Sequence, residues 1–203
     1  MPNFSFDPEQ VDGLVNNHVK DGSSLVLDLR GNPGGYVVTL EKLAGYFFDR
    51  DVKIADLKGR KEMKAQEAKS KGDKAFKGKV IVLIDNQSGS AAEIFARLMQ
   101  IEKRGIVIGD RSAGAVMQSR SYGQKSGVNT VVFYGISVTN ADVIMSDGKS
   151  LEKTGVTPDE MMLPTGKDMA AKRDPVLARA VELAGGKISP EQAGGFFPIQ
   201  WRK

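Results

Sequence analysis

The sequence predicts an α/β domain with a mostly parallel, buried β-sheet, because the same order of features occurs twice. Residues 24–30 (SLVLDLR) and 80–85 (VIVLID) are largely continuous apolar runs, which are typical of strands covered on both faces. Each run leads into a turn sequence, GNPGG at 31–35 and NQSG at 86–89, and then into apolar residues at helical spacing. Strand, turn, helix and strand in this order are typical of a parallel α/β sheet.

Similar patterns place the other elements along the chain. Helices are expected at residues 8–20, 36–48 and 90–103, and further strands at 105–109, 128–138 and 143–145. Asp174 and Pro175 suit the N-cap and first position of a closing helix that ends at Gly185. We expect one core domain over residues 1–185 and an irregular tail over residues 186–203. We also expect the core to be truncated at its amino-terminal end relative to a longer parent protein.

Composition excludes several kinds of chemistry. The 203 residues include no cysteine, which excludes a thiol nucleophile, a thiolate metal site and a disulfide scaffold. No apolar stretch approaches the roughly 20 residues that a membrane span requires, and no signal-peptide pattern opens the chain. The sequence contains neither a phosphate-loop motif nor a cluster of metal ligands, so we expect no metal and no organic cofactor.

Many of the positive charges lie between residues 57 and 79 (LKGRKEMKAQEAKSKGDKAFKGK), in a chain whose net charge is +4. Such a run is compatible with a patch that binds nucleic acid or another acidic surface. However, acidic residues interrupt it, and Phe76 is its only aromatic residue. We therefore expect a solvated, mobile connector here, and no nucleic-acid partner.

Two loops are candidates for the functional site, because sites in open α/β sheets form beyond the carboxyl ends of the strands. Ser90 lies at the start of a helix, whose free N–H groups and partial positive charge favour a developing oxyanion. The Ala91 N–H is one candidate oxyanion donor. Gly34 and Gly35 offer a second, because a backbone without Cβ can approach a ligand closely. Taken alone, each pattern is more often a simple helix cap or a simple turn.

Taken together, the two loops resemble those of the C-terminal-processing (tail-specific) serine peptidases. The resemblance rests on LVLDLRGNPGGYV at 25–37 followed by VIVLIDNQSGSAAEIFARLMQ at 80–100. It continues through IVIGDRSAG at 106–114 and GISVTNADVIMSDGKSLEKTGVTPDE at 135–160, and covers about residues 24–185. It implies the crotonase/ClpP-like α/β spiral of strand-strand-helix units.

The resemblance also implies roles for individual residues. Ser90 has the position of the catalytic nucleophile, and Ala91 that of the oxyanion donor after it. Gly34 and Gly35 have the position of the other half of the oxyanion hole.

The sequence departs from this family at the general base. Tail-specific members carry a lysine base on a turn after the IVIG-type strand, and here Ala115 (or Gly114, counted back from Gln118) holds that position. Neither residue has a side chain that can accept a proton from serine. Lys103 and Lys125 lie near in sequence, but we expect them to be solvated charges.

Relatives typified by the tricorn protease core use serine, histidine and a glutamate that orients the histidine. In that branch the glutamate precedes a GVxPD motif, which Glu152 does here with the motif at 155–159; an exposed turn glutamate is the alternative. His18 is the only histidine, and we expect it to be solvated on a surface helix. The resemblance therefore implies that the catalytic histidine comes from an upstream region, which often bears a peptide-binding PDZ module in relatives.

We thus expect a serine endopeptidase core that hydrolyses polypeptides through an acyl-enzyme on Ser90, with Glu152 as the second catalytic residue. The substrate is expected to add as a strand to an exposed edge. The alternatives are a non-catalytic module of the same fold that binds peptide or an apolar ligand, and a crotonase-type acyl-CoA enzyme. The resemblance implies an exported or periplasmic location in a bacterium, or a cytoplasmic one for the tricorn-like branch.

Overall fold

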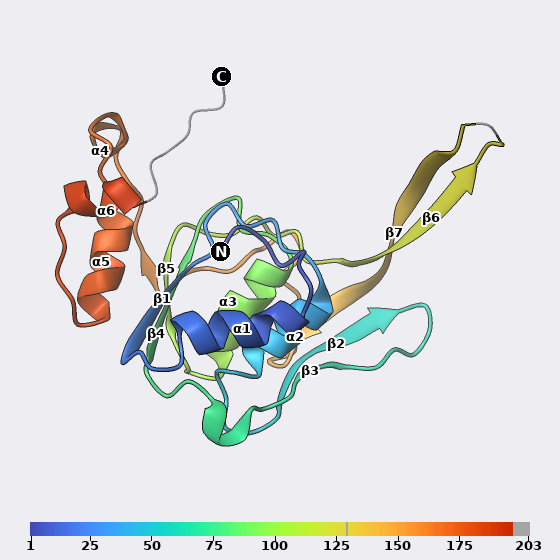
Figure 1. Cartoon of the computed structure of the whole chain (residues 1–203), viewed down its shortest axis with the longest axis horizontal. Helices are drawn as coiled ribbons and strands as arrows, with labels where there is room; N and C mark the ends of the chain where they lie inside the picture. Colours follow the sequence, from blue (N-terminus) through green and yellow to red (C-terminus); the bar gives the residue numbers. More distant parts are fainter. Residues whose placement is uncertain (129, 197–203) are drawn as a thin grey trace.

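The chain folds around two four-stranded sheets, in a computed structural model that describes residues 1–128 and 130–196. The first sheet is parallel and has the strand order β1-β4-β5-β8, with β1 at Ser24–Asp28, β4 at Lys79–Ile84, β5 at Ile106–Gly109 and β8 at Glu160–Met161. The second is antiparallel and has the order β3-β2-β7-β6, with β2 at Val52–Gly59, β3 at Gln66–Ala68, β6 at Gln118–Ser126 and β7 at Val132–Met145. Beyond its pairing with β2, β7 forms a long hairpin with β6 that extends away from the body (Figure 1).

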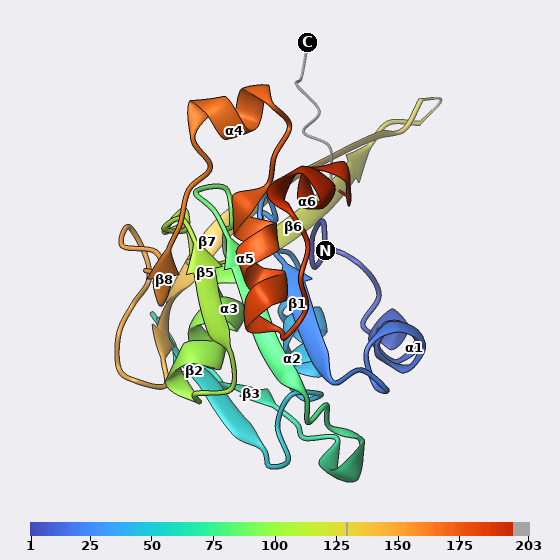
Figure 2. The same ribbon diagram turned by 90° about the vertical axis from the view of Figure 1, so that its left-hand side faces the viewer.

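Helices cover both faces of the parallel sheet. The helices α1 (Glu9–His18), α2 (Val37–Ala44) and α3 (Ala91–Ile101) lie on one side, and α5 (Pro175–Leu183) lies with α6 (Pro190–Phe196) on the other (Figures 1 and 2). Two short elements complete the fold, the 3-10 turn η1 (Gly72–Lys74) and helix α4 (Gly166–Ala170). No helix in the described part of the chain is both long and apolar enough to cross a bilayer.

Alternation along β4 explains the two-sided core, because successive side chains of a strand point to opposite faces. Val82 and Ile84 belong to the apolar cluster that contains Phe95 of α3, whereas Leu83 belongs to the cluster that contains Leu177 of α5. All five residues are buried. The predicted strand that is covered on both faces is therefore confirmed, as is the α/β fold class with its parallel sheet.

Three stretches differ from the expectations. The segment 57–79 is not simply a solvated connector, because β2 reaches Gly59, β3 follows, and Gln66 and Phe76 are buried. The strand expected at 128–138 begins at Val132 and joins the strand expected at 143–145 in the longer β7, whose partner β6 was not expected. Polar residues dominate β3 and β6, so neither shows the apolar alternation that identifies a strand.

The tail beyond residue 185 is helical over α6, where an irregular chain was expected. Ser189 and Gln192 cap this helix reciprocally: the Ser189 N–H donates to the Gln192 side chain at 2.9 Å, and the Gln192 N–H donates to Ser189 Oγ at 3.2 Å. Ala193 is buried against α5. The expected tail over residues 197–203 lies outside the described residues.

Candidate active site

The turn that carries Ser90 joins the end of β4 to the start of α3. Ser90 is the N-cap of α3 and has φ 51° and ψ −118°, a backbone conformation that residues other than glycine rarely adopt. Its side chain is half-buried, while Ala91 and Ala92 behind it are buried. A serine on a strained turn between a strand and a helix is typical of serine nucleophiles, because the turn presents the hydroxyl at the end of the sheet.

The glycine-rich loop 31–35 lies directly against this turn. The strands β1 and β4 are parallel neighbours with Asp28 opposite Leu83, so the loops that follow them start at the same level. Gly34 has φ +97°, and a Cβ built on it would lie 2.6 Å from Ser90 Cβ and 2.9 Å from the Ala91 nitrogen. Only glycine fits this position. The structure therefore brings together Ser90, Ala91 and Gly34, which the sequence predicted to share one site.

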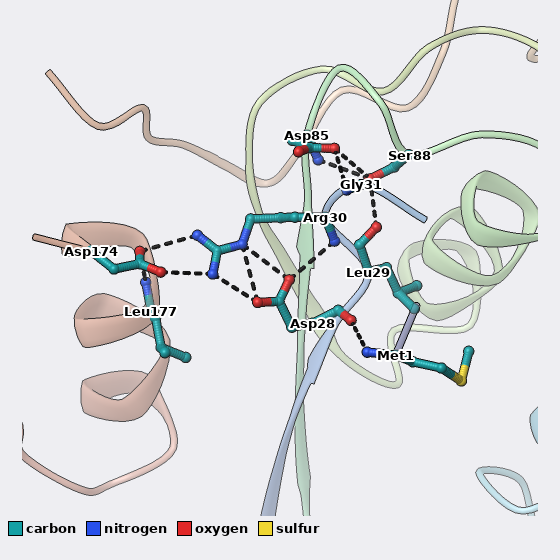
Figure 3. A network of polar contacts seen from close by, with 9 residues as sticks. All are labelled: Met1, Asp28, Leu29, Arg30, Gly31, Asp85, Ser88, Asp174 and Leu177. Carbon is teal, nitrogen blue, oxygen red and sulfur yellow. Dashed lines mark hydrogen bonds and ion pairs between the residues drawn. The ribbon is translucent and has the colours of Figure 1, made fainter. Parts of the chain in front are cut away.

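Hydrogen bonds between the two loops hold this contact in place. Ser88 is buried and its Oγ donates to the Leu29 carbonyl at 2.8 Å, while the Asp85 carboxylate accepts from the Gly31 N–H at 2.9 Å (Figure 3). The Gly89 N–H donates to the Asn32 carbonyl at 2.9 Å. The loop after β1 and the turn after β4 thus form one connected unit.

The two glycines of the loop differ as oxyanion donors. The Gly34 N–H donates to the Asn32 side-chain oxygen at 2.8 Å in a fully buried setting, so it is already engaged. Gly35 is exposed, has φ +147°, and its N–H makes no hydrogen bond with any residue that the structure describes. Of the two, Gly35 is therefore the one whose N–H is free to meet a ligand.

Glu93 is a residue of this site that the sequence interpretation missed. Its carboxylate is fully buried and accepts four hydrogen bonds, from the N–H groups of Ser90 (2.9 Å), Gly114 (2.7 Å) and Ala115 (3.0 Å) and from Ser112 Oγ (2.6 Å). One carboxylate thus joins the Ser90 turn to the loop after β5. The Ser-x-x-Glu spacing of Ser90 and Glu93 is that of a capping box, and this signal could have identified Glu93.

The position that resembles the family's lysine lies beside Ser90. The Ala115 carbonyl accepts the Ser90 N–H at 3.0 Å, although Ala115 has no group that can act as a base. Glu152 holds the next residue of the same loop, because its carboxylate accepts the Val116 N–H at 2.8 Å. Glu152 is half-buried, so the exposed-turn alternative does not describe it. The loop after β5 thus contacts the Ser90 turn through Ala115 and the Glu152 carboxylate through Val116.

The other candidate bases lie elsewhere. His18 is exposed and ends α1 just before β1 begins, so it lies at the opposite end of the parallel sheet from the loops that follow β1 and β4. Lys103 follows the carboxyl end of α3, whereas Ser90 precedes its amino end. Lys125 is exposed near the far end of β6. None of these side chains reaches the Ser90 turn.

A charged network ties the carboxyl-terminal helices to the same loop. Arg30, the residue before Gly31, pairs with Asp28 and with Asp174, the N-cap of α5, each at 2.7 Å (Figure 3). Burial acts to lower the pKa of Arg30, but the hydrogen bonds with both carboxylates outweigh it and raise the pKa above its ordinary value. A cavity of about 770 Å³ lies beside this network, and Ser90 does not line it. The described residues contain no group of three or more potential metal ligands.

The fold and this site together define a class, that of α/β proteins with a serine at a strained strand-to-helix turn. The chain belongs to peptidase family S41, whose family model matches residues 1–162. It is similar to the carboxy-terminal-processing protease of Bartonella bacilliformis, with 32% identity over 139 residues that make up 66% of this chain and 30% of the relative. It is also similar to the carboxy-terminal processing protease CtpB of Bacillus subtilis, with 28% identity over 196 residues, or 91% of this chain and 39% of that one.

Solved structures agree on the fold. The crystal structure of the tricorn protease matches 91% of this chain and 17% of its own length, with a TM-score of 0.60 and 18% sequence identity. At that identity the match shows the fold alone. The chain spans about a third of the length of the two curated relatives named above, at 30% and 39%.

Proposed function

We propose that this chain is the catalytic core of a serine-type endopeptidase that hydrolyses polypeptides through an acyl-enzyme on Ser90. The observation that carries the proposal is the contact of the Ser90 turn with the loop 31–35, at a distance that only Gly34 permits. It supports one site that holds a nucleophile and two sets of backbone donors. Membership of peptidase family S41 supports the same reaction class.

The reaction has two steps. Ser90 Oγ attacks the scissile carbonyl carbon and gives its proton to a general base, and the carbonyl oxygen becomes an oxyanion. The base then protonates the leaving amine as the C–N bond breaks, which leaves the acyl group on Ser90. Water hydrolyses this ester by the same route and regenerates the hydroxyl.

The oxyanion donors in this proposal are the N–H groups of Ala91 and Gly35. Ala91 N–H belongs to the first turn of α3, whose free N–H groups and helix dipole favour negative charge. Gly35 is exposed and its N–H has no partner among the described residues, while Gly34 provides the close approach and has its own N–H held by Asn32. Removal of one such donor typically lowers kcat by about a hundredfold or more.

The general base in this proposal is a histidine from a region upstream of residue 1, oriented by Glu152 as in the tricorn-like branch that the sequence resembles. Two observations support this assignment. Ala115, which has no basic side chain, holds the lysine position, and the Glu152 carboxylate binds the loop whose Ala115 carbonyl accepts the Ser90 N–H. The polypeptide substrate and an upstream, PDZ-bearing partner region belong to the same proposal, supported by the share of the relatives that this chain covers.

The test is hydrolysis of unfolded casein by the full gene product, beside its Ser90→Ala and Glu152→Gln variants. The proposal predicts that Ser90→Ala abolishes hydrolysis and that Glu152→Gln lowers kcat with little change in KM. Hydrolysis that survives Ser90→Ala contradicts the assignment of the nucleophile.

A second candidate function is favoured by the absence of a base near Ser90 within the described residues. A non-catalytic module of the same fold would bind peptide or an apolar ligand and would need no base. A gene product without an upstream histidine, which binds unfolded casein but does not hydrolyse it, would support this second candidate over the first.

A further inference from the structure

The strand β6 presents an open edge that begins shortly after the loop in contact with the turn of the candidate nucleophile. It is the outer strand of the antiparallel sheet and pairs with β7 alone, so the N–H and C=O groups along its other side have no strand partner among the described residues. All of its residues from Ser119 to Ser126 are exposed. We call this open side of Gln118–Ser126 the β6 edge.

The β6 edge differs from the other outer edges of the two sheets. The strand β8 has two residues and β3 has three, of which two are buried. The strand β1 is half-buried along its whole length. By contrast β6 has nine residues, which corresponds to about 30 Å of extended chain. Among the described strands, β6 therefore offers the long exposed template on which another strand can add.

The position of the β6 edge ties it to the candidate site. The strand begins three residues after Ala115, whose carbonyl accepts the Ser90 N–H at 3.0 Å. From there the hairpin runs outward from the body (Figure 1). A strand added to the β6 edge would consequently have one end toward the loop that contacts the Ser90 turn and the other toward the hairpin tip.

The charge of the hairpin indicates what kind of chain it would bind. Residues 116–141 contain Arg120 and Lys125 and no aspartate or glutamate. Arg120 also lies over the exposed ring of Tyr122, with 5.7 Å between the guanidinium carbon and the ring centroid. Two cations without a neighbouring carboxylate favour acidic side chains on the incoming strand, and repel basic ones.

We propose that the β6 edge is the docking site for an extended, acidic segment of the polypeptide substrate, which adds as a fifth strand and is delivered to Ser90. The proposal rests on the proposed peptidase function for its occupant. Backbone hydrogen bonds supply affinity in such β-augmentation, and side chains on the outer strand supply selectivity.

The experiment measures binding rather than hydrolysis, so that the two proposals can fail separately. The 203-residue chain with Ser90→Ala is titrated into fluorescein-labelled extended peptides as long as β6, one rich in glutamate and one with lysine in its place, and anisotropy is recorded. We expect the glutamate peptide to bind about tenfold more tightly. Arg120→Glu with Lys125→Glu should reverse that preference, whereas Lys61→Glu with Lys64→Glu, an equal charge change on an exposed loop, should preserve it.

A second measurement probes the strand addition from the peptide side, where protein folding is not at risk. N-methylation removes one backbone donor at a time, and on an added strand only every second N–H faces the template. We expect affinity to fall about two- to tenfold at alternate positions and to stay unchanged between them. A photo-crosslinker in the peptide should label residues 118–126.

The results separate the two proposals. Docking at the β6 edge is overturned if Arg120→Glu with Lys125→Glu leaves the binding of both peptides unchanged. It is also overturned if N-methylation lowers the affinity without alternation along the peptide. If Arg120→Glu with Lys125→Glu leaves casein hydrolysis by the full gene product unchanged, docking at the β6 edge is likewise overturned, while the peptidase proposal stands. If N-methylation lowers peptide affinity at alternate positions but the gene product never hydrolyses casein, the result supports the docking site and overturns the peptidase proposal instead.

Discussion

A methyl group added to Gly34 would lie 2.6 Å from Ser90 Cβ, closer than two such carbons can approach. At this point the loop after β1 and the turn after β4 approach more closely than any residue other than glycine allows. The same added methyl group would lie 2.9 Å from the Ala91 nitrogen. The proposed oxyanion hole therefore depends on a glycine that contributes space, with Gly35 beside it contributing the donor.

The first prediction follows from that contact. Gly34→Ala should lower the free energy of unfolding by about 3 kcal/mol, through backbone clashes and a left-handed φ, and should abolish labelling of Ser90 by a fluorophosphonate. Gly31→Ala is the control, because Gly31 also has a positive φ (+67°) but a methyl group added to it would have no other atom within 4 Å. It should lose only about 1 kcal/mol and keep its labelling rate. Equal behaviour of the two variants would remove the argument from close approach.

Glu93 provides the second prediction. Glu93→Gln preserves shape but replaces one acceptor oxygen by a donor that faces backbone N–H groups, so stability should fall by about 2–3 kcal/mol. Because Ala115 and Ser90 both bond to this carboxylate, the Ser90 labelling rate should fall as well. Glu182→Gln on the surface of α5, whose only ion pair is with Arg179 among the described residues, should change stability by less than about 1 kcal/mol. Urea denaturation and intact-mass labelling measure both effects.

The third prediction concerns the missing base. Ala115→Lys attaches an amine to the residue whose carbonyl bonds to the Ser90 N–H, and should raise the Ser90 labelling rate about a hundredfold. The rate should increase with pH, because only the deprotonated amine accepts the serine proton. Ala113→Lys, at an exposed position two residues earlier in the same loop, should leave the rate unchanged. A similar gain in both variants would show that added charge, and not position, is responsible.

Alkaline stability supplies the fourth prediction. Burial, together with the hydrogen bond that its hydroxyl donates to Asp12 at 2.6 Å, raises the pKa of Tyr46 to about 12. An unfolded tyrosine titrates near pH 10, so the unfolded state loses its proton first. The stability that Tyr46 contributes is therefore present below about pH 10 and is lost as the pH rises toward 12. Tyr46→Phe should flatten this decline in urea denaturation, and Tyr36→Phe, at an exposed tyrosine, should keep the wild-type slope.

The core of the fold was predictable from local patterns, and the same holds for part of the site. Apolar runs identified β1 and β4 because both are packed between layers of helices, and Asp174 caps α5 as its sequence indicates. By contrast, β6 is exposed over almost its whole length, so no burial pattern marks it. Which donors gather around Glu93 depends on how loops distant in sequence meet. The capping-box spacing indicates Glu93 and its bond to Ser90, but its bonds to Gly114 and Ala115 are set by tertiary geometry and have no signal in spacing.

The assignment of Ser90 is best tested by a time course of fluorophosphonate labelling of the 203-residue chain and its Ser90→Ala variant, followed by intact mass and peptide mapping. An oxyanion hole alone can retain about a thousandfold of catalysis without the base. We therefore predict slow labelling that is confined to Ser90 and abolished by Ser90→Ala. Labelling spread over other serines, or an adduct that persists in the folded Ser90→Ala variant, would contradict the assignment of Ser90 as the nucleophile.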